Sequence, residues 1–235
     1  MKHGNVAVVQ FAERDTPGSI PVILRDRSVP FDVIRVDLGQ PIPEVGALAG
    51  LVLLGSSLSV DEPAPWKKPV VSAVEQCFEH DVAVIGHCFG GQLMAKILGA
   101  RVERCPEPEV GWSRIRSTAP SSVPWPSEFI ALQWHFDGFS TPRGAVPLWR
   151  SDAWENQGFS YGKHIAMQFH IEATLCEVQR WCASNQDLFE RPQAGVQALR
   201  QLTELAATAV VDQITVAEQI YGAWLASQHG GTADE

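Results

Sequence analysis

The chain has 235 residues, of which 45% are apolar and 19% are charged, a composition typical of a globular protein rather than a disordered one. This length is sufficient for one α/β domain with a full core, or at most for two small domains. The formal net charge of −9 argues against binding to nucleic acid or to an anionic membrane, because both select a basic protein face.

The cysteines form no Cys-x-x-Cys pair and lie at Cys77, Cys88, Cys105, Cys176 and Cys182. An odd number without regular spacing fits free thiols in a reducing compartment. It also argues against a zinc ribbon, so we expect no metal site. The first apolar run, Val6–Phe11, is too short for a signal peptide or a membrane span, and we expect a cytoplasmic protein.

The first half of the chain alternates short apolar strands with helices. The predicted strands are Val6–Phe11, Phe31–Val36, Gly50–Leu54 and Val82–Ile85. Helices are expected at residues 18–28 and at Pro69–His80, where proline can occupy a helix start. This alternation predicts right-handed βαβ units, and the continuously apolar strands predict a parallel sheet covered on both faces.

The second half follows a different pattern. Short strands among proline-rich loops are expected at residues 101–104, Val110–Arg116 and Phe129–Gln133. A hairpin is predicted to join Asn156–Tyr161 to Ile165–Phe169 through Gly162-Lys163.

The chain is predicted to be helical from Ala173 onward. Apolar residues recur at spacings of three and four from Leu199 to Trp224, with one polar exception at Gln213. Thr215-x-x-Glu218 has the form of a capping box, which would divide this stretch into two helices. No repeat or linker is evident, so we expect one domain.

The sharpest local feature is Gly86-His87-Cys88-Phe89-Gly90-Gly91-Gln92, between a predicted strand and a predicted helix. It has the G-x-C-x-G form of a nucleophile elbow, a strained turn in which neighbouring backbones crowd the flanking glycines. The turn would hold the Cys88 sulfur near the positive end of the helix, which favours the thiolate. A buried cysteine is often only a small core residue, however, so catalysis also needs a base.

Two histidines could supply that base. His170 follows an apolar strand, and Glu172, two residues later, could hold its imidazole while it activates the thiol. His135 offers a similar pairing with Asp137. Either pairing could also arise by chance, because the chain has 27 acidic residues.

Taken together, these residues resemble the class I glutamine amidotransferases. That family shows a strand ending in a glycine pair, then G-x-C-x-G-x-Q, then F-H-x-E, in this order. The corresponding segments here are Leu54-Gly55-Ser56-Ser57, Gly86–Gln92 and Phe169-His170-Ile171-Glu172. Trp134–Phe139 resembles the H-x-D loop of the GMP-synthase-like branch.

The resemblance, which covers residues 5 to about 185, implies a fold and a domain plan. The expected fold is flavodoxin-like α/β, with a mostly parallel central sheet flanked by helices on both faces and with added C-terminal helices. The single amidotransferase domain would span residues 1–235, with its catalytic core at about 5–185 and a helical extension at about 186–235.

The resemblance also implies catalytic residues. Cys88, His170 and Glu172 would form a Cys-His-Glu triad, and the backbone N–H groups of Ser56 and Phe89 would form an oxyanion hole. Cys88 would attack the side-chain amide of L-glutamine and form a γ-glutamyl thioester, so that ammonia leaves and water releases glutamate. Neither a metal nor an organic cofactor is implied.

The same resemblance implies a substrate pocket that includes Gln92, His135 and Asp137. One position departs from the family pattern in a way that bears on this site, since the usual Gly-Gly-Pro is Gly55-Ser56-Ser57 here. A side chain at Ser56 would alter the turn if its φ were positive.

Three functions remain open on the sequence. The first is a glutaminase that passes ammonia to a separate synthetase or acceptor subunit. The second is a free-standing γ-glutamyl peptide hydrolase with the same triad. The third is an inactive binding or regulatory module, against which the intact triad argues. We expect neither nucleic acid nor a membrane as a partner.

Overall fold

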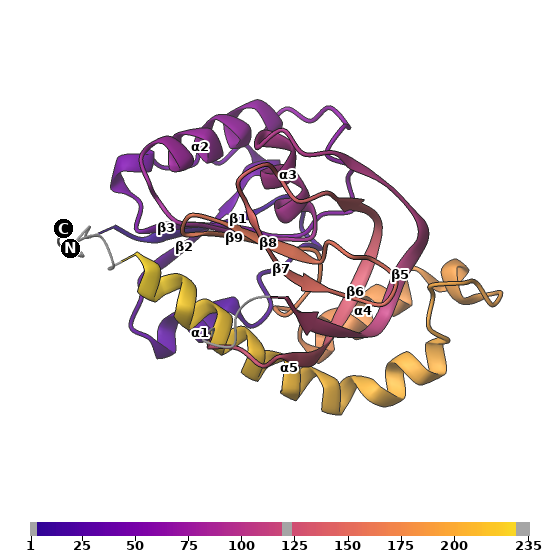
Figure 1. Ribbon diagram of the computed structural model, residues 1–235. Coiled ribbons are helices and arrows are strands. Elements are labelled where there is room, and N and C mark those ends of the chain that lie inside the picture. The colour runs from indigo at the N-terminus through magenta and orange to yellow at the C-terminus, as the bar shows by residue number, and fades with distance from the viewer. Residues whose placement is uncertain (1–3, 119–123, 229–235) are drawn as a thin grey trace.

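The computed structural model describes residues 4–118 and 124–228 (Figure 1). Within these residues, nine strands form one sheet in the order β2-β1-β3-β4-β9-β8-β7-β5-β6. The first five strands in that order are parallel, namely β2 (Phe31–Arg35), β1 (Val6–Gln10), β3 (Gly50–Leu53), β4 (Val84–His87) and β9 (His164–Met167). The remaining strands pair antiparallel, namely β8 (Gly158–Tyr161), β7 (Val146–Arg150), β5 (Val102–Ser117) and β6 (Glu128–Phe139).

Helices cover both faces of the parallel part of the sheet (Figure 1). On one face lie α2 (Lys67–Glu79) and α3 (Phe89–Ile97), and on the other lie α1 (Ile20–Asp26) and α5 (Leu199–Ser227). The alternation of β1 explains this arrangement, because Val6 and Val8 join the core under α1 and α5 while Ala7 and Val9 join the core under α2 and α3. The predicted α/β fold with a mostly parallel core and two helical layers is confirmed.

The antiparallel part of the sheet corrects one prediction. The short strands expected over residues 101–133 are two long strands, β5 and β6, and the segment Trp134–Phe139 belongs to β6 rather than to a loop. The register of the pair shifts between Arg104 and Glu109, where Pro106 and Pro108 lie. Prolines cannot donate to the hydrogen-bond ladder of a sheet, and they concentrate at such bulges. For this reason the local sequence predicted short strands where β5 is one continuous strand.

The C-terminal segment corrects a second prediction. A single helix, α5, runs through the capping box predicted at Thr215-x-x-Glu218. The Thr215 hydroxyl donates instead to the carbonyl of Val211, one turn back in the same helix. Gln213 is fully buried, donates to the carbonyl of Ala173 and accepts from the N–H of Leu132. The polar exception in the apolar stripe thus satisfies two buried backbone groups, and the helix continues because its apolar face packs on the sheet.

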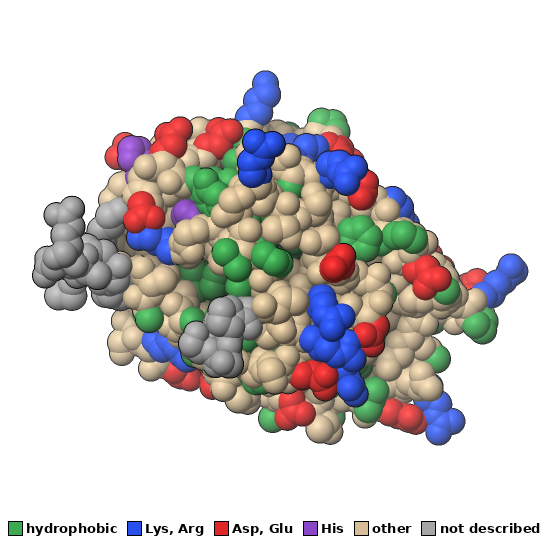
Figure 2. All heavy atoms as spheres, in the orientation of Figure 1, with side chains coloured by type: hydrophobic (Ala, Val, Ile, Leu, Met, Phe, Trp, Pro, Cys, Tyr) green, Lys and Arg blue, Asp and Glu red, His purple; other side chains and the backbone are tan. Residues whose placement is uncertain are grey.

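A true capping box begins α4 (Leu175–Ser184), in which Thr174 and Glu177 bond each other's backbone groups. Three short 3₁₀ helices complete the described elements, at Val36–Leu38, Val45–Ala47 and Gln186–Phe189. In the described ranges, no helix combines the length and the apolar character needed to cross a bilayer. Figure 2 shows acidic and basic side chains interspersed over one face of the molecule.

Candidate active site

Cys88 occupies the turn between β4 and α3 with φ of 45° and ψ of −107°, a conformation that L-residues rarely adopt. Its backbone N–H donates to the carbonyl of Met167 on β9 at 2.8 Å, which holds the turn against the sheet. A Cβ on Gly86 would lie 2.7 Å from the carbonyl carbon of Gly90, and one on Gly90 would lie 2.5 Å from the carbonyl oxygen of Leu53. Both glycines of the motif are therefore required by close backbone packing, and the elbow stores strain at its central residue.

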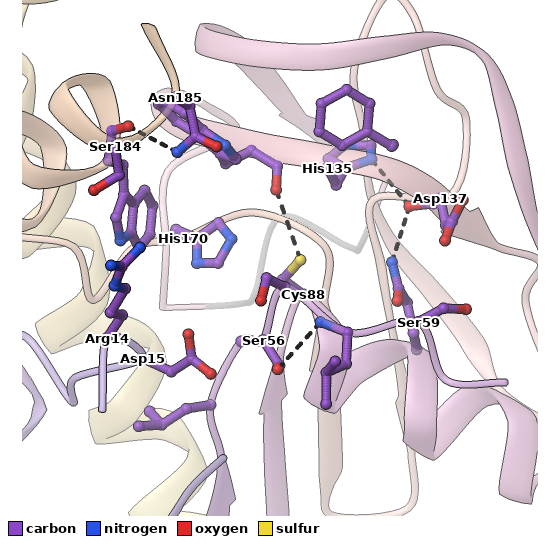
Figure 3. A pocket seen from close by; sticks show the side chains of 18 of the residues that line it. Arg14, Asp15, Ser56, Ser59, Cys88, His135, Asp137, His170, Ser184 and Asn185 are labelled. Carbon is purple, nitrogen blue, oxygen red and sulfur yellow. Dashed lines mark hydrogen bonds between the residues drawn. The ribbon is translucent and has the colours of Figure 1, made fainter. Parts of the chain in front are cut away.

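His170 lies beside Cys88 (Figure 3). Its backbone N–H donates to the carbonyl of Leu132 on β6 at 2.8 Å, and its Nδ1 lies 2.7 Å from Oε1 of Glu172. A Cβ on Gly55 would lie 2.7 Å from Cε1 of His170 and 3.6 Å from Cβ of Cys88. Gly55 thus leaves the space in which the imidazole and the thiol approach each other.

His170 and Glu172 each shift the pKa of the other toward its charged form. Burial lowers the pKa of His170, but the neighbouring Glu172 carboxylate and the hydrogen-bonded Cys88 outweigh it and raise that pKa to about 10. Burial also disfavours ionised Glu172, yet His87 and His170 together hold the pKa of this carboxyl well below its usual value. At neutral pH the arrangement therefore favours an imidazolium at His170 beside an ionised Glu172 carboxylate.

A second histidine reaches the same carboxylate. Nδ1 of His87, a fully buried residue, lies 2.9 Å from Oε2 of Glu172. Its Nε2 lies 2.8 Å from the hydroxyl of Tyr221, which belongs to α5. The Tyr221 hydroxyl can donate to Nε2, which leaves Nδ1 as the ring nitrogen in close contact with Glu172. Neither His87 nor Tyr221 has a role predicted from the sequence, although His87 lies inside the elbow motif.

The structure separates His135 from the thiol chemistry. Its Nε2 lies 3.1 Å from Oε2 of Glu109, and its Nδ1 lies 3.1 Å from the carbonyl of Asp137, so both ring nitrogens face other protein atoms. The Asp137 carboxylate lies 3.6 Å from the guanidinium of Arg104 and is partly exposed. Both His135 and Asp137 line the same cavity as Cys88, on the side away from His170 (Figure 3).

Gln92, one turn into α3, also lines this cavity. Its side-chain nitrogen donates to the carbonyl of Asp137 at 2.9 Å and to Oε1 of Gln168 at 3.3 Å. The Gln168 side chain in turn donates to Sγ of Cys88 at 3.4 Å. The donor side of Gln92 is thus committed to the protein, and its oxygen is the part that could accept from a ligand.

Two backbone N–H groups are suited to an oxyanion. The N–H of Phe89, the first residue of α3, has no partner within the helix. Among the hydrogen bonds of the described residues, the N–H of Ser56 donates to no backbone acceptor. Ser56 does not have positive φ, so its side chain is accommodated without strain where the family pattern has glycine.

The cavity has a volume of about 490 Å³ and lies at the carboxyl ends of the parallel strands. Its other lining residues include Arg14, Asp15, Thr16, Arg180 and Trp181, none of which the sequence analysis selected. Asp15 follows β1, and the carboxyl ends of strands are where α/β proteins bind ligands, so a positional signal existed for it. Arg180 and Trp181 lie on α4, where no sequence signal distinguished them from a solvated helix face.

No group of three or more metal-ligating side chains occurs over residues 4–118 and 124–228. The cavity brings together the Cys88 thiol, the His170 imidazole and the backbone N–H groups of Ser56 and Phe89. Such a set can form and hydrolyse an acyl-cysteine intermediate.

Comparison with known proteins gives a consistent result. The family model for glutamine amidotransferase class-I matches residues 20–184. The chain is 30% identical over 156 residues to one subunit of the glutamine-hydrolyzing GMP synthase of Thermoplasma volcanium, covering 64% of this chain and 74% of that protein. It is also 30% identical to the glutamine-hydrolyzing GMP synthase of Aromatoleum aromaticum, over 52% of this chain but only 22% of that longer protein.

Solved structures extend the similarity over nearly the whole chain. A glutamine amidotransferase from Methylobacillus flagellatus superposes with a TM-score of 0.90 at 30% identity, covering 98% of each chain. One from Thermotoga maritima superposes with a TM-score of 0.85 at 27% identity, covering 95% of this chain and 98% of that one.

Proposed function

The chain belongs to the class I glutamine amidotransferases, in their GMP-synthase-like branch, and on this premise we propose that it hydrolyses the side-chain amide of L-glutamine through a thioester at Cys88. The observation that carries the proposal is the contact of the His170 imidazole with both Cys88 and Glu172. A base held between a thiol and a carboxylate is the arrangement that activates a cysteine nucleophile.

In the proposed first step, the thiolate of Cys88 attacks the amide carbon and the carbonyl oxygen becomes negatively charged. The N–H groups of Phe89 and Ser56 donate to this oxygen, and they stabilise it more than the ground-state carbonyl. The C–N bond then breaks as His170 gives its proton to the leaving nitrogen. Ammonia departs and the γ-glutamyl group remains on sulfur.

In the second step, His170 accepts a proton from water, and the resulting hydroxide attacks the thioester. Glutamate leaves and the thiolate is restored. Glu172 stabilises the imidazolium whenever it forms and keeps one ring orientation. For the substrate's α-ammonium we propose Asp137, which lines the cavity on the side of Cys88 away from His170 (Figure 3). For its carboxamide we propose the side-chain oxygen of Gln92, which lines the same cavity and whose side chain bonds the Asp137 carbonyl.

We further propose that the ammonia serves an acceptor reaction on a separate protein. The name of the Thermoplasma volcanium relative describes it as one subunit of a GMP synthase. The likeness to the Aromatoleum aromaticum protein covers only about a fifth of that synthase, so most of that enzyme lies outside the matched segment.

Release of glutamate and ammonium from L-glutamine by the purified chain tests this function. A glutamine-analogue alkylating agent, read by intact mass, tests the nucleophile even where turnover depends on a partner. Absence of both hydrolysis and a one-to-one adduct would refute the proposal.

A further inference from the structure

The direction in which the leaving group departs follows from the position of His170. The leaving nitrogen takes its proton from this imidazole, so any substituent on that nitrogen extends into the space beside His170. On the proposed function, the γ-glutamyl part lies on the other side of Cys88, where Figure 3 shows Asp137 and where the Gln92 side chain bonds the Asp137 carbonyl. The cavity therefore has an acyl half and a leaving-group half, and ammonia would occupy almost none of the latter.

The leaving-group half is lined by polar and aromatic side chains. The Trp181 ring packs edge-on against the His170 ring, with centroids 4.9 Å apart, and forms an apolar wall next to the general acid. Arg14 and Asp15 lie on the same side of Cys88 as His170 (Figure 3). Arg180 lies one residue before Trp181 on α4 and lines the same cavity.

Two buried polar atoms in this half have no hydrogen-bond partner within the described part of the chain. They are Oδ2 of Asp15 and Nε of Arg180. The rest of the Arg180 guanidinium is held in place, because its Nη2 donates to Oε1 of Glu177 at 2.8 Å and to the hydroxyl of Thr16 at 3.1 Å. Asp15 and Arg180 both line the cavity, so this half of it carries a carboxylate that can accept hydrogen bonds and a guanidinium that can donate them.

The volume points the same way. A cavity of about 490 Å³ falls in the range of pockets that enclose a ligand of drug size, and it exceeds the needs of one amino acid. A ligand that fills it beyond the γ-glutamyl group must carry a hydrogen-bond donor for Asp15 and an acceptor for Arg180. An α-amino acid linked through its nitrogen offers both, with its carboxylate as the acceptor.

Resting on the proposed function, we propose that this half of the cavity is a leaving-group subsite for an α-amino acid, so that the enzyme also cleaves γ-glutamyl dipeptides. Arg180 and Arg14 bind the C-terminal carboxylate of the dipeptide, and Asp15 accepts from the leaving amine. The side chain of the released amino acid packs on Trp181. The glutaminase contacts on the acyl side are unchanged.

The reaction balances without a further reagent. The thiolate of Cys88 forms the C–S bond to the γ-carbonyl carbon, and the C–N bond breaks with its electron pair on nitrogen. His170 gives one proton to that nitrogen, and the free amino acid leaves. Water then cleaves the thioester as it does with glutamine, so the products are glutamate and one amino acid.

The test compares γ-glutamyl-alanine with the same dipeptide in which the C-terminal carboxylate is a carboxamide. In the wild-type enzyme we expect kcat/KM to be at least about tenfold higher for the free acid, the size of one charge-assisted contact. The combined Arg14→Gln and Arg180→Gln variant should reduce this acid-to-amide ratio to near one. Arg200→Gln is the matched control, because Arg200 bonds Glu204 on the exposed face of α5 and should leave the ratio unchanged.

A binding measurement separates this proposal from the proposed function. Calorimetry on Cys88→Ala, which cannot turn over either dipeptide, should show the same preference for the free acid. Equal affinity for γ-glutamyl-alanine and its C-terminal amide would contradict the proposed subsite. A preference for the free acid that persists in the combined Arg14→Gln and Arg180→Gln variant would contradict it as well. Failure of the proposed function would appear elsewhere, as a wild-type enzyme that binds the acid selectively but hydrolyses neither L-glutamine nor the dipeptide.

Discussion

Nδ1 of His87 lies 2.9 Å from Oε2 of Glu172, while Nδ1 of His170 lies 2.7 Å from Oε1 of the same carboxylate. Glu172 is thus held from both sides by imidazoles, and the outer one is fixed by Tyr221 of α5. The long C-terminal helix therefore reaches the Glu172 carboxylate through Tyr221 and His87. This relationship gives a buried polar residue of the elbow a positioning role.

Replacing His87 should change the rate without changing the substrate pocket. We expect His87→Phe to lower kcat about tenfold to a hundredfold, because it removes the imidazole in close contact with the buried Glu172 carboxylate, with little change in KM. Since His87 lowers the pKa of Glu172, its loss should also move the acid limb of the kcat/KM profile to higher pH. Tyr221→Phe is the milder comparison, and a His87→Phe enzyme with the wild-type pH profile would contradict the role.

Cys88→Ala should abolish glutamine hydrolysis and leave the fold intact. Removal of a covalent nucleophile costs several orders of magnitude in rate, whereas a buried sulfur replaced by hydrogen in an elbow turn changes little packing. Peptide mass spectrometry after reaction with a glutamine-analogue alkylator should locate the label at Cys88. A label on Cys105, which also lies close to His135, would refute the assignment.

His170→Ala should affect the catalytic rate, whereas His135→Ala should affect thermal stability. We expect the first to lower kcat by about a thousandfold or more, because it removes the group that exchanges protons with the thiol and the leaving nitrogen. The second removes the partner of buried Glu109 and should chiefly lower the thermal unfolding temperature. The rate of Cys88 alkylation against pH distinguishes them, since only the loss of His170 should change that profile. An unchanged alkylation profile in His170→Ala would contradict the assignment of the base.

Asp15→Asn should stabilise the protein in a pH-dependent way. Burial raises the pKa of Asp15 from its ordinary 3.8 to about 6, against the opposing effect of a hydrogen bond from Ser56. A raised carboxyl pKa means that the folded state binds the proton more tightly, so ionisation of Asp15 costs stability above about pH 6 and nothing below pH 3.8. Chemical denaturation should show Asp15→Asn more stable than wild type by up to about 3 kcal/mol at pH 8, with the difference nearly gone at about pH 3. Equal gains at both pH values would show that the carboxylate is not the cause.

Asp137→Asn should raise KM for L-glutamine more than it lowers kcat. This pattern marks a contact made equally to the substrate and the transition state, as expected for the α-ammonium. N-acetylated glutamine, which lacks that charge, should be a poor substrate of the wild-type enzyme. Steady-state kinetics decide the matter, and an unchanged KM in Asp137→Asn would remove this carboxylate from the pocket.

Some features of the chain were available from local sequence. The strands of the parallel core have distinctive apolar runs, and the glycines at Gly86 and Gly90 mark a turn that backbone sterics reserve for them. The order of the glycine strand, the elbow and the F-H-x-E segment was likewise recognisable, because each belongs to a short stretch. These signals led to the family and to the α/β fold.

Other features depended on residues far apart in the chain. The pairing of β5 with β6 passes through a proline-containing bulge, and the continuity of α5 depends on how its apolar face and Gln213 meet the sheet. Neither the β5–β6 pairing nor the continuity of α5 can be predicted from the local sequence, because both depend on hydrogen bonds between residues far apart in the chain. For these elements the tertiary contacts override the local turn and capping preferences.

The same division applies to the site. Sequence alone determined which residues could carry acyl-transfer chemistry, since Cys88 and His170 lie in motifs whose geometry is set within a few residues. Only the tertiary structure brought Asp15, Arg180 and His87 to that chemistry. Asp15 lies at the end of β1, Arg180 on α4 and His87 against α5, so their roles depend on the packing of separate elements. Side chains that act across such interfaces carry no local signature, because their partners are chosen by the fold and not by spacing along the chain.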